Sequence, residues 1–75
     1  MNEKTTQMAM EFLGVPMNEV EKYSMHLPEI DSFLFCKPGR GGSKIIINAD
    51  GEKLITGSAI NLDEMVSDFK SGKRN

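Results

Sequence analysis

The chain has too few cysteine and histidine residues to be stabilised by disulfides or by a zinc site. Its 75 residues include one cysteine, Cys36, and one histidine, His26. A single cysteine cannot form an internal disulfide, and a lone thiol is typical of a protein in a reducing compartment. A Cys/His zinc site needs further ligands of the same kind, so no metal is expected. A domain of this size has a thin apolar core that must supply most of its stability.

Long apolar segments and an excess of positive charge are also missing. Apolar runs such as Ile45-Ile46-Ile47 are far shorter than the ~20 residues of a membrane helix. The N-terminus has no basic segment followed by an apolar stretch, so no signal peptide is expected. The net charge of −2 produces no general attraction to nucleic acid or anionic membranes. These features predict one soluble, cytoplasmic domain over residues 1–75 that does not bind membranes.

Helix patterns lie near both ends of the chain. A C-terminal helix is expected over 62–71, because Asn61 can cap its start and Gly72 can end it. Its apolar residues recur at the spacing of one helix face. They are Leu62, Met65, Val66 and Phe69. A first helix is expected from about Glu3 to Leu13, where Gly14 is suited to end it.

Strand patterns occupy the region between these helices. The Asp50-Gly51 pair readily adopts positive φ angles, which predicts a tight hairpin turn between strands at 44–48 and 53–56. Residues 33–37 are rich in aromatic and apolar side chains and are expected to form another strand. Apolar and polar residues alternate over 23–27, which is typical of a strand.

The expected fold class is α+β, with elements in the order α-β-β-β-β-α. Short connections favour an antiparallel meander, and we expect both helices to cover one face of the sheet. Residues 17–27 leave one alternative open, because residues 18–22 are also compatible with the start of a short helix.

A glycine-rich segment, residues 39–44, joins two of the expected strands. A nucleotide-binding P-loop is excluded, because Ser43 precedes Lys44 and the next element is a strand rather than a helix. The segment is either an ordinary hairpin connection or a recognition loop whose backbone amides and flanking cations bind an anion or a partner. In the second case the predicted contact residues are Lys37, Arg40, Gly41, Gly42 and Lys44.

Four carboxylates flank the strand expected at 23–27, namely Glu19, Glu21, Glu29 and Asp31. They form either a solvated surface or an acidic patch that meets a basic partner, such as the nucleic-acid cleft of a nuclease. Glu21 and Asp31 are the predicted contacts in this group.

No catalytic residue or cofactor is predicted. His26 is expected to be an ordinary surface or half-buried histidine, and Cys36 a small buried apolar residue in its strand. No third group is placed to orient a Cys–His pair, and a domain this small has little room for a catalytic pocket.

The C-terminal half resembles the YrhB-like immunity proteins associated with bacterial polymorphic toxins. The residues that carry the resemblance are Arg40-Gly41-Gly42, Ile45-Ile46-Ile47, Asp50-Gly51, Gly57-Ser58-Ala59, Phe69 and Gly72-Lys73-Arg74. Many such sequences have a histidine early in the final helix, where this chain has Met65 and Val66. The resemblance implies an inhibitor that binds a cognate toxin.

Three hypotheses follow from the sequence. The first is a protein-binding module of the immunity type, whose partner is a toxin or another bacterial protein. The alternative is a small nucleic-acid- or phosphate-binding domain that uses Lys37, Arg40 and Lys44, with Phe33 or Phe35 as a stacking surface. The third is a homo-oligomer, formed if the isoleucine strand lies at a sheet edge.

Overall fold

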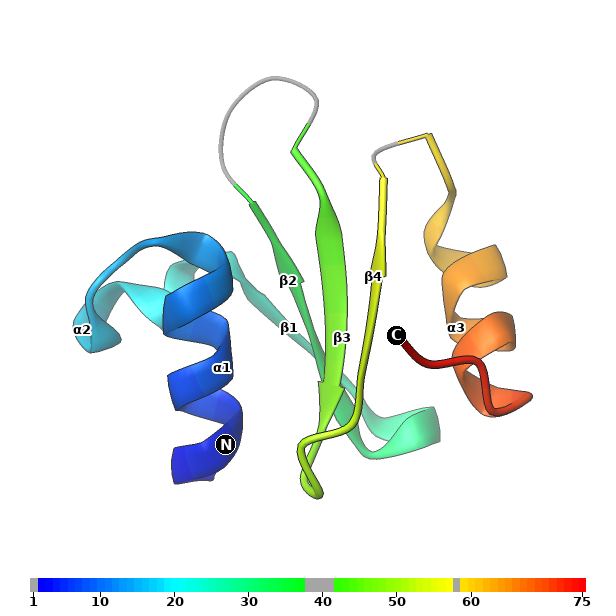
Figure 1. Cartoon of the computed structure of the whole chain (residues 1–75), viewed down its shortest axis with the longest axis horizontal. Coiled ribbons are helices and arrows are strands. Elements are labelled where there is room, and N and C mark those ends of the chain that lie inside the picture. The colour runs from blue at the N-terminus through cyan, green and yellow to red at the C-terminus, as the bar shows by residue number, and fades with distance from the viewer. Residues whose placement is uncertain (1, 38–41, 58) are drawn as a thin grey trace.

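A four-stranded antiparallel sheet is the centre of the computed structural model, which describes residues 2–37, 42–57 and 59–75. The strands lie in the order β1-β2-β3-β4, so the predicted α+β meander is confirmed (Figure 1). Their bounds are Ser24–Leu27 (β1), Ser32–Cys36 (β2), Lys44–Asn48 (β3) and Lys53–Thr56 (β4). The helices are α1 (Glu3–Leu13), α2 (Met17–Val20) and α3 (Leu62–Lys70). No helix among the described residues is long and apolar enough to cross a membrane.

The first helix has the predicted bounds, and local hydrogen bonds explain both of its ends. The Asn2 side chain accepts a hydrogen bond of 2.8 Å from the Thr5 amide at the start of α1. Gly14 ends the helix at a φ of 70°, and its N–H donates to the Met10 carbonyl. Glycine adopts this left-handed conformation without steric strain, because it has no Cβ.

The final helix repeats this arrangement. The Asn61 side chain accepts from the Glu64 amide at 2.8 Å, and Gly72 adopts a φ of 100°. The helix ends at Lys70, one residue before the predicted end.

The region before β1 resolves the alternative left open by the sequence. Helix α2 and a 3-10 turn, Glu21–Tyr23, occupy its first part, and the chain becomes extended only from Ser24. The strand predicted over 23–27 and the short helix are therefore both present, one after the other.

The helices lie on opposite faces of the sheet, so the prediction that both cover one face is wrong. Figure 1 shows the sheet between α1 and α3. Phe35, Ile45 and Ile47 pack with residues of α1, whereas Leu34, Ile46 and Leu54 pack with residues of α3. Successive side chains of a strand point to opposite faces. Since all three isoleucines of β3 are at most 2% exposed, each face needs its own cover.

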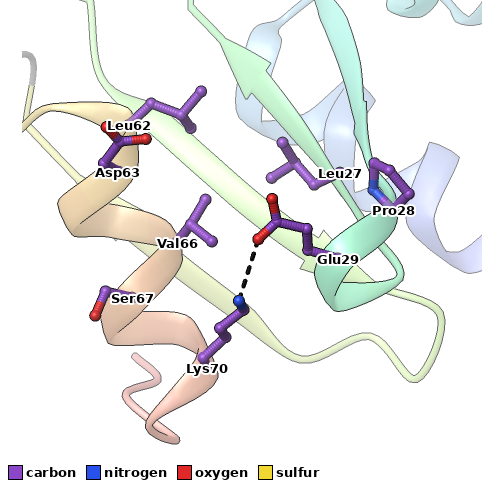
Figure 2. A pocket seen from close by; sticks show the side chains of 8 residues that line it. All are labelled: Leu27, Pro28, Glu29, Leu62, Asp63, Val66, Ser67 and Lys70. Atoms are coloured by element: carbon purple, nitrogen blue, oxygen red, sulfur yellow. Dashed lines mark hydrogen bonds and ion pairs between the residues drawn. The ribbon is translucent and has the colours of Figure 1, made fainter.

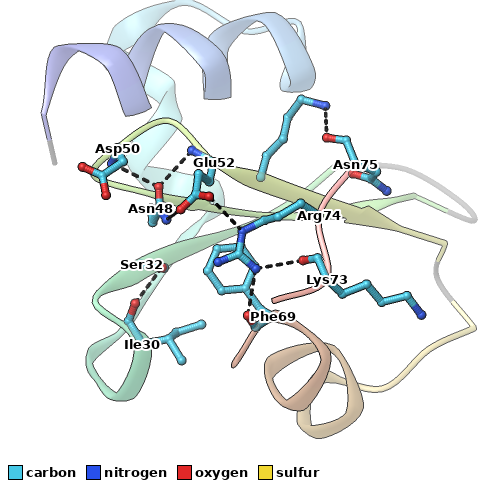
Figure 3. Close-up of polar contacts among 10 residues, drawn as sticks. Ile30, Ser32, Asn48, Asp50, Glu52, Phe69, Lys73, Arg74 and Asn75 are labelled. Carbon is cyan, nitrogen blue, oxygen red and sulfur yellow. Dashed lines mark hydrogen bonds and ion pairs between the residues drawn. The ribbon is translucent and has the colours of Figure 1, made fainter. Parts of the chain in front are cut away.

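The hairpin between β3 and β4 is present, but its turn differs from the one expected. Only Gly51 has a positive φ, of 86°, and Asp50 does not. The Asn48 amide donates to the Glu52 carbonyl, which closes a three-residue loop. The Asn48 side chain also accepts from the Asp50 and Glu52 amides, at 3.0 and 2.9 Å (Figure 3). Because the side chain organises the loop, a single positive φ is sufficient.

The isoleucine strand β3 is central, so the hypothesis that it forms a sticky sheet edge is wrong. The edges are β1 and β4. Asn75 lies beside β4, and its side chain forms hydrogen bonds with both the backbone N–H and the backbone C=O of Ile55. Its Oδ1 accepts from the Ile55 amide at 2.9 Å, and its Nδ2 donates to the Ile55 carbonyl at 3.0 Å. The Asn75 amide also donates to the Lys53 carbonyl at 3.2 Å.

Candidate protein-binding surface

An open pocket of about 310 Å³ lies between α3 and the turn that joins β1 to β2 (Figure 2). Its lining residues are Leu27, Pro28, Glu29, Leu62, Asp63, Val66, Ser67 and Lys70, and we refer to it as the α3 pocket. The pocket forms where this face of the sheet is least covered. Leu34 and Leu54 are each 3% exposed, whereas Leu27 on β1 is only half-buried.

Met25 extends this partly covered area along β1. It is directly opposite Leu34 in the sheet, so its side chain is on the α3 face, and it is 52% exposed. Met17, the other large exposed apolar residue among the described residues, is 63% exposed and belongs to α2. An apolar strip therefore runs from β1 into the α3 pocket.

A single ion pair crosses the α3 pocket. Lys70 Nζ lies 3.1 Å from Glu29 Oε2, with the two side chains 51% and 72% exposed. Exposed pairs of this kind contribute about 0–1 kcal/mol to stability. Either group can therefore leave the pair and contact a partner at small cost. An apolar floor within a charged, solvated rim is the usual anatomy of a protein-binding patch.

The two predicted acidic contacts lie at opposite ends of β1 and do not form one cluster. Glu21 precedes the strand, and its carbonyl accepts a hydrogen bond of 2.9 Å from the Ser24 hydroxyl. Asp31 follows the strand in the β1–β2 turn, with a φ of 48°. Both are exposed, and neither belongs to an ion pair within the described part of the chain. The other two carboxylates of this group do form ion pairs, Glu19 with Lys22 and Glu29 with Lys70.

The basic residues flanking the glycine-rich segment already have contacts within the chain. Lys44 Nζ donates to the Ile60 carbonyl at 2.8 Å, and Lys37 Nζ lies 5.7 Å from the centre of the Phe12 ring. Two of the predicted contacts, Arg40 and Gly41, lie outside the described residues. Lys44 is at the end of the sheet that also carries Glu21, because Lys44 is opposite Cys36 and Ser24 is opposite Phe35. Asp31 is at the other end.

Gly42 is required by close packing. A Cβ at this position would lie 2.2 Å from the Lys37 carbonyl oxygen, which is too close for any real contact. Replacing Gly42 by alanine is expected to lower the free energy of unfolding by about 1–3 kcal/mol, because the backbone must move to relieve the overlap. Urea denaturation measures this change.

Gly57→Ala is the matched control for that prediction. A Cβ there meets nothing within 4 Å, so the free energy of unfolding should change little. Equal effects of the two substitutions would contradict the close approach at Gly42.

The aromatic and sulfur-containing candidates are placed differently from what the sequence predicted. Phe35 is fully buried, so it cannot stack on a nucleic-acid base, and Phe33 is half-buried with its ring 4.9 Å from His26. Cys36 is exposed rather than buried, because it ends its strand. His26 is exposed and shares a face with Phe33, whereas Cys36 shares the opposite face with Leu34. These two residues therefore do not form a Cys–His pair.

The residues near the C-terminus that carry the family resemblance have structural contacts. The Arg74 guanidinium lies 3.6 Å from the centre of the Phe69 ring and donates to the Phe69 carbonyl at 2.8 Å (Figure 3). Gly72 and Lys73 donate their amides to the carbonyls of Phe69 and Asp68, which ends α3. This motif therefore closes a helix rather than presenting a binding surface.

Sequence reasoning missed the α3 pocket and Met25. Leu62 and Val66 belong to the same apolar stripe as Met65 and Phe69, and no feature of the stripe separates pocket residues from core residues. Among the described residues, no group of three or more His, Cys, Asp or Glu could hold a metal ion. Comparison with known protein families, curated proteins and solved structures finds no match to this chain.

Proposed function

We propose that the chain is a small protein-binding module without catalytic activity, of the immunity type, that covers a surface of a toxin or another bacterial protein. The observation that carries the proposal is the apolar strip from Met25 into the α3 pocket. Large apolar side chains that stay exposed beside a hollow are typical of interaction sites. The pocket itself is near the lower limit of volume for small-molecule sites and is about half open to solvent, which favours side chains of a partner over an enclosed substrate.

The alternative is a nucleic-acid- or phosphate-binding domain that uses the glycine-rich segment. Its remaining support is the exposed Lys37 and the composition of residues 39–44. The contact of Lys44 with Ile60 and the burial of Phe35 weigh against it. Binding of this kind would weaken steeply with added salt, whereas a packed protein interface responds less.

Met25→Glu is expected to abolish partner capture while leaving the fold intact. The side chain is half exposed, so its replacement should change the free energy of unfolding by less than about 0.5 kcal/mol. At a binding surface, loss of a central apolar contact and introduction of a charge should weaken the complex by roughly tenfold or more. The measurement is a tagged pull-down from lysate of the source organism after nuclease treatment, with retained protein and nucleic acid both quantified.

Met17→Glu is the matched control, since it introduces the same change at an exposed methionine on α2. We expect the wild-type chain and this control to retain one protein near equal stoichiometry, and Met25→Glu to lose it. Addition of the chain to the purified partner should then inhibit that partner's activity. Retention of nucleic acid alone would favour the alternative. Retention of the same partner by all three chains would show that the binding surface lies elsewhere.

A further inference from the structure

We infer that the partner contributes an extended segment that pairs with the free edge of β1 and carries basic residues on both sides of the paired stretch. This inference rests on the proposed function and specifies how the partner is bound. It follows from a difference between the two edges of the sheet and from the position of two carboxylates.

The edge at β4 is already occupied within the chain. Asn75 forms three hydrogen bonds to the backbone of Lys53 and Ile55. Two are made by its side-chain amide and one by its backbone N–H. A side-chain amide that bonds one residue at both N–H and C=O reproduces what a neighbouring strand would supply. In addition, Lys53 places a charge on this strand, and edge charges are a common protection against strand addition.

Among the described residues, the edge at β1 is protected only at its start, where the Ser24 amide donates to the Glu21 carbonyl. Within the part of the chain that the structure describes, its only strand neighbour is β2, and the sequence of β1, Ser-Met-His-Leu, contains no Lys, Arg, Asp or Glu. In an antiparallel pair, alternate residues of an edge strand direct both N–H and C=O away from their neighbour. These groups are matched most completely by another extended backbone. β4 also has four residues, yet its outer edge is covered by Asn75. The two edges therefore differ in their protection and not in strand length.

The charges beside β1 determine which extended segment fits. Glu21 and Asp31 are exposed and lie one at each end of the strand. A segment paired along β1, which is ~13 Å long at ~3.3 Å per residue, passes close to both ends. Basic residues on either side of the paired stretch would meet these carboxylates, and acidic ones would be repelled.

The same charges disfavour a second copy of this chain as the occupant. In an antiparallel β1–β1 pair, the residues that precede one strand lie near those that follow the other. Glu21 of one copy would therefore approach Asp31 of the other, which brings like charges together. Complementary charge thus favours a different, basic partner.

The side chains of the paired segment are constrained by the face that they share with Met25. Alternate residues of the segment would lie on the α3 face, beside Met25 and next to the α3 pocket. Because this strip is apolar, the segment should have apolar residues at alternate positions and basic residues outside them.

The test uses the intact chain and three synthetic peptides at millimolar concentration. The first peptide is Lys-Lys-Val-Thr-Val-Thr-Val-Lys-Lys, the second has Glu in place of every Lys, and the third is the first with N-methylated central residues that cannot complete a strand pair. NMR chemical shifts and hydrogen exchange of the Ser24–Leu27 amides measure binding. We expect the Lys-flanked peptide to protect these amides, to bind about fivefold more tightly than the Glu-flanked one at low salt, and to lose binding when N-methylated.

A charge exchange tests the assignment of the two carboxylates. The double variant Glu21→Lys/Asp31→Lys should reverse the preference, so that the Glu-flanked peptide binds more tightly. Glu11→Lys/Asp50→Lys has the same net charge and serves as the control, which should keep the original preference. Unchanged preference in the first variant, or an equal reversal in both, would overturn the inference.

Failure of the inference can be distinguished from failure of the proposed function. If the Lys-flanked peptide leaves the β1 amides unprotected, edge pairing is overturned, whereas a captured partner that is lost with Met25→Glu still supports the proposed function. Dimerisation of the chain through β1, detected by sedimentation and by the same amides, would also overturn the inference, because the occupant would then be a second copy.

Discussion

Phe35→Ala is expected to lower the free energy of unfolding by about 3–5 kcal/mol. The ring is fully buried between β2 and the helices on the α1 face, where it contacts the cluster that contains Ala9 and Leu13. Its removal loses the transfer free energy of a large apolar side chain and leaves a cavity that the surrounding strands cannot fill. Small domains have a total stability of about 5–15 kcal/mol, so the variant should be partly unfolded at 37 °C. Thermal and urea denaturation followed by circular dichroism measure the loss.

Phe35→Leu is the companion variant, because it keeps most of the apolar volume and should be clearly less destabilised. This pair of variants also tests the nucleic-acid hypothesis, in which Phe35 served as a stacking residue. If Phe35→Ala kept wild-type stability and lost binding to an oligonucleotide, the burial of this ring would be contradicted.

Phe69→Ala is expected to have an effect of similar size on the other face, about 3–5 kcal/mol. Phe69 is 3% exposed and packs with the cluster that contains Ile46 and Leu54. Its ring also lies under the Arg74 guanidinium, at 3.6 Å, and such a contact adds about 0.5–2 kcal/mol depending on its burial. The substitution should therefore loosen both the attachment of α3 to the sheet and the position of Arg74. Urea denaturation measures the total loss.

A double-mutant cycle separates the two contributions of Phe69. Arg74→Ala alone should destabilise the chain by less than Phe69→Ala. Its effect should be smaller still in the Phe69→Ala background, because the stacking partner is then missing. Additive effects would mean that the guanidinium is held by its hydrogen bonds to backbone carbonyls and not by the ring. This result bears on the family resemblance, since Phe69 and Arg74 are two of the positions that carry it.

The predicted site was only partly recoverable from the sequence. Glu21 and Asp31 were identified because they flank an alternating strand, and both are exposed at its ends. The alternation of apolar and polar residues could not indicate that β1 is an edge of the sheet. The two carboxylates therefore lie at the two ends of an edge strand, which only the fold reveals. Lys44 was chosen for its charge alone, but its ammonium group bonds the Ile60 carbonyl, 16 residues away. The α3 pocket depends on α3 and the β1–β2 turn lying side by side, and neither segment by itself carries a signal for it.

The positions of the first and last helices, of the four strands and of the β3–β4 turn could be predicted from the sequence, because each depends on residues close together in the chain. Asn2, Asn61 and Gly14 act within one helical turn, and the β3–β4 hairpin is closed by Asn48 and Gly51. The face that each helix covers, the identity of the edge strands and the burial of each aromatic ring became clear from the folded chain alone. These properties depend on packing between distant segments. In the run Ile45-Ile46-Ile47, the residues of one helix bury Ile45 and Ile47, and those of another helix bury Ile46. The strand sequence does not indicate which helix covers which of these residues.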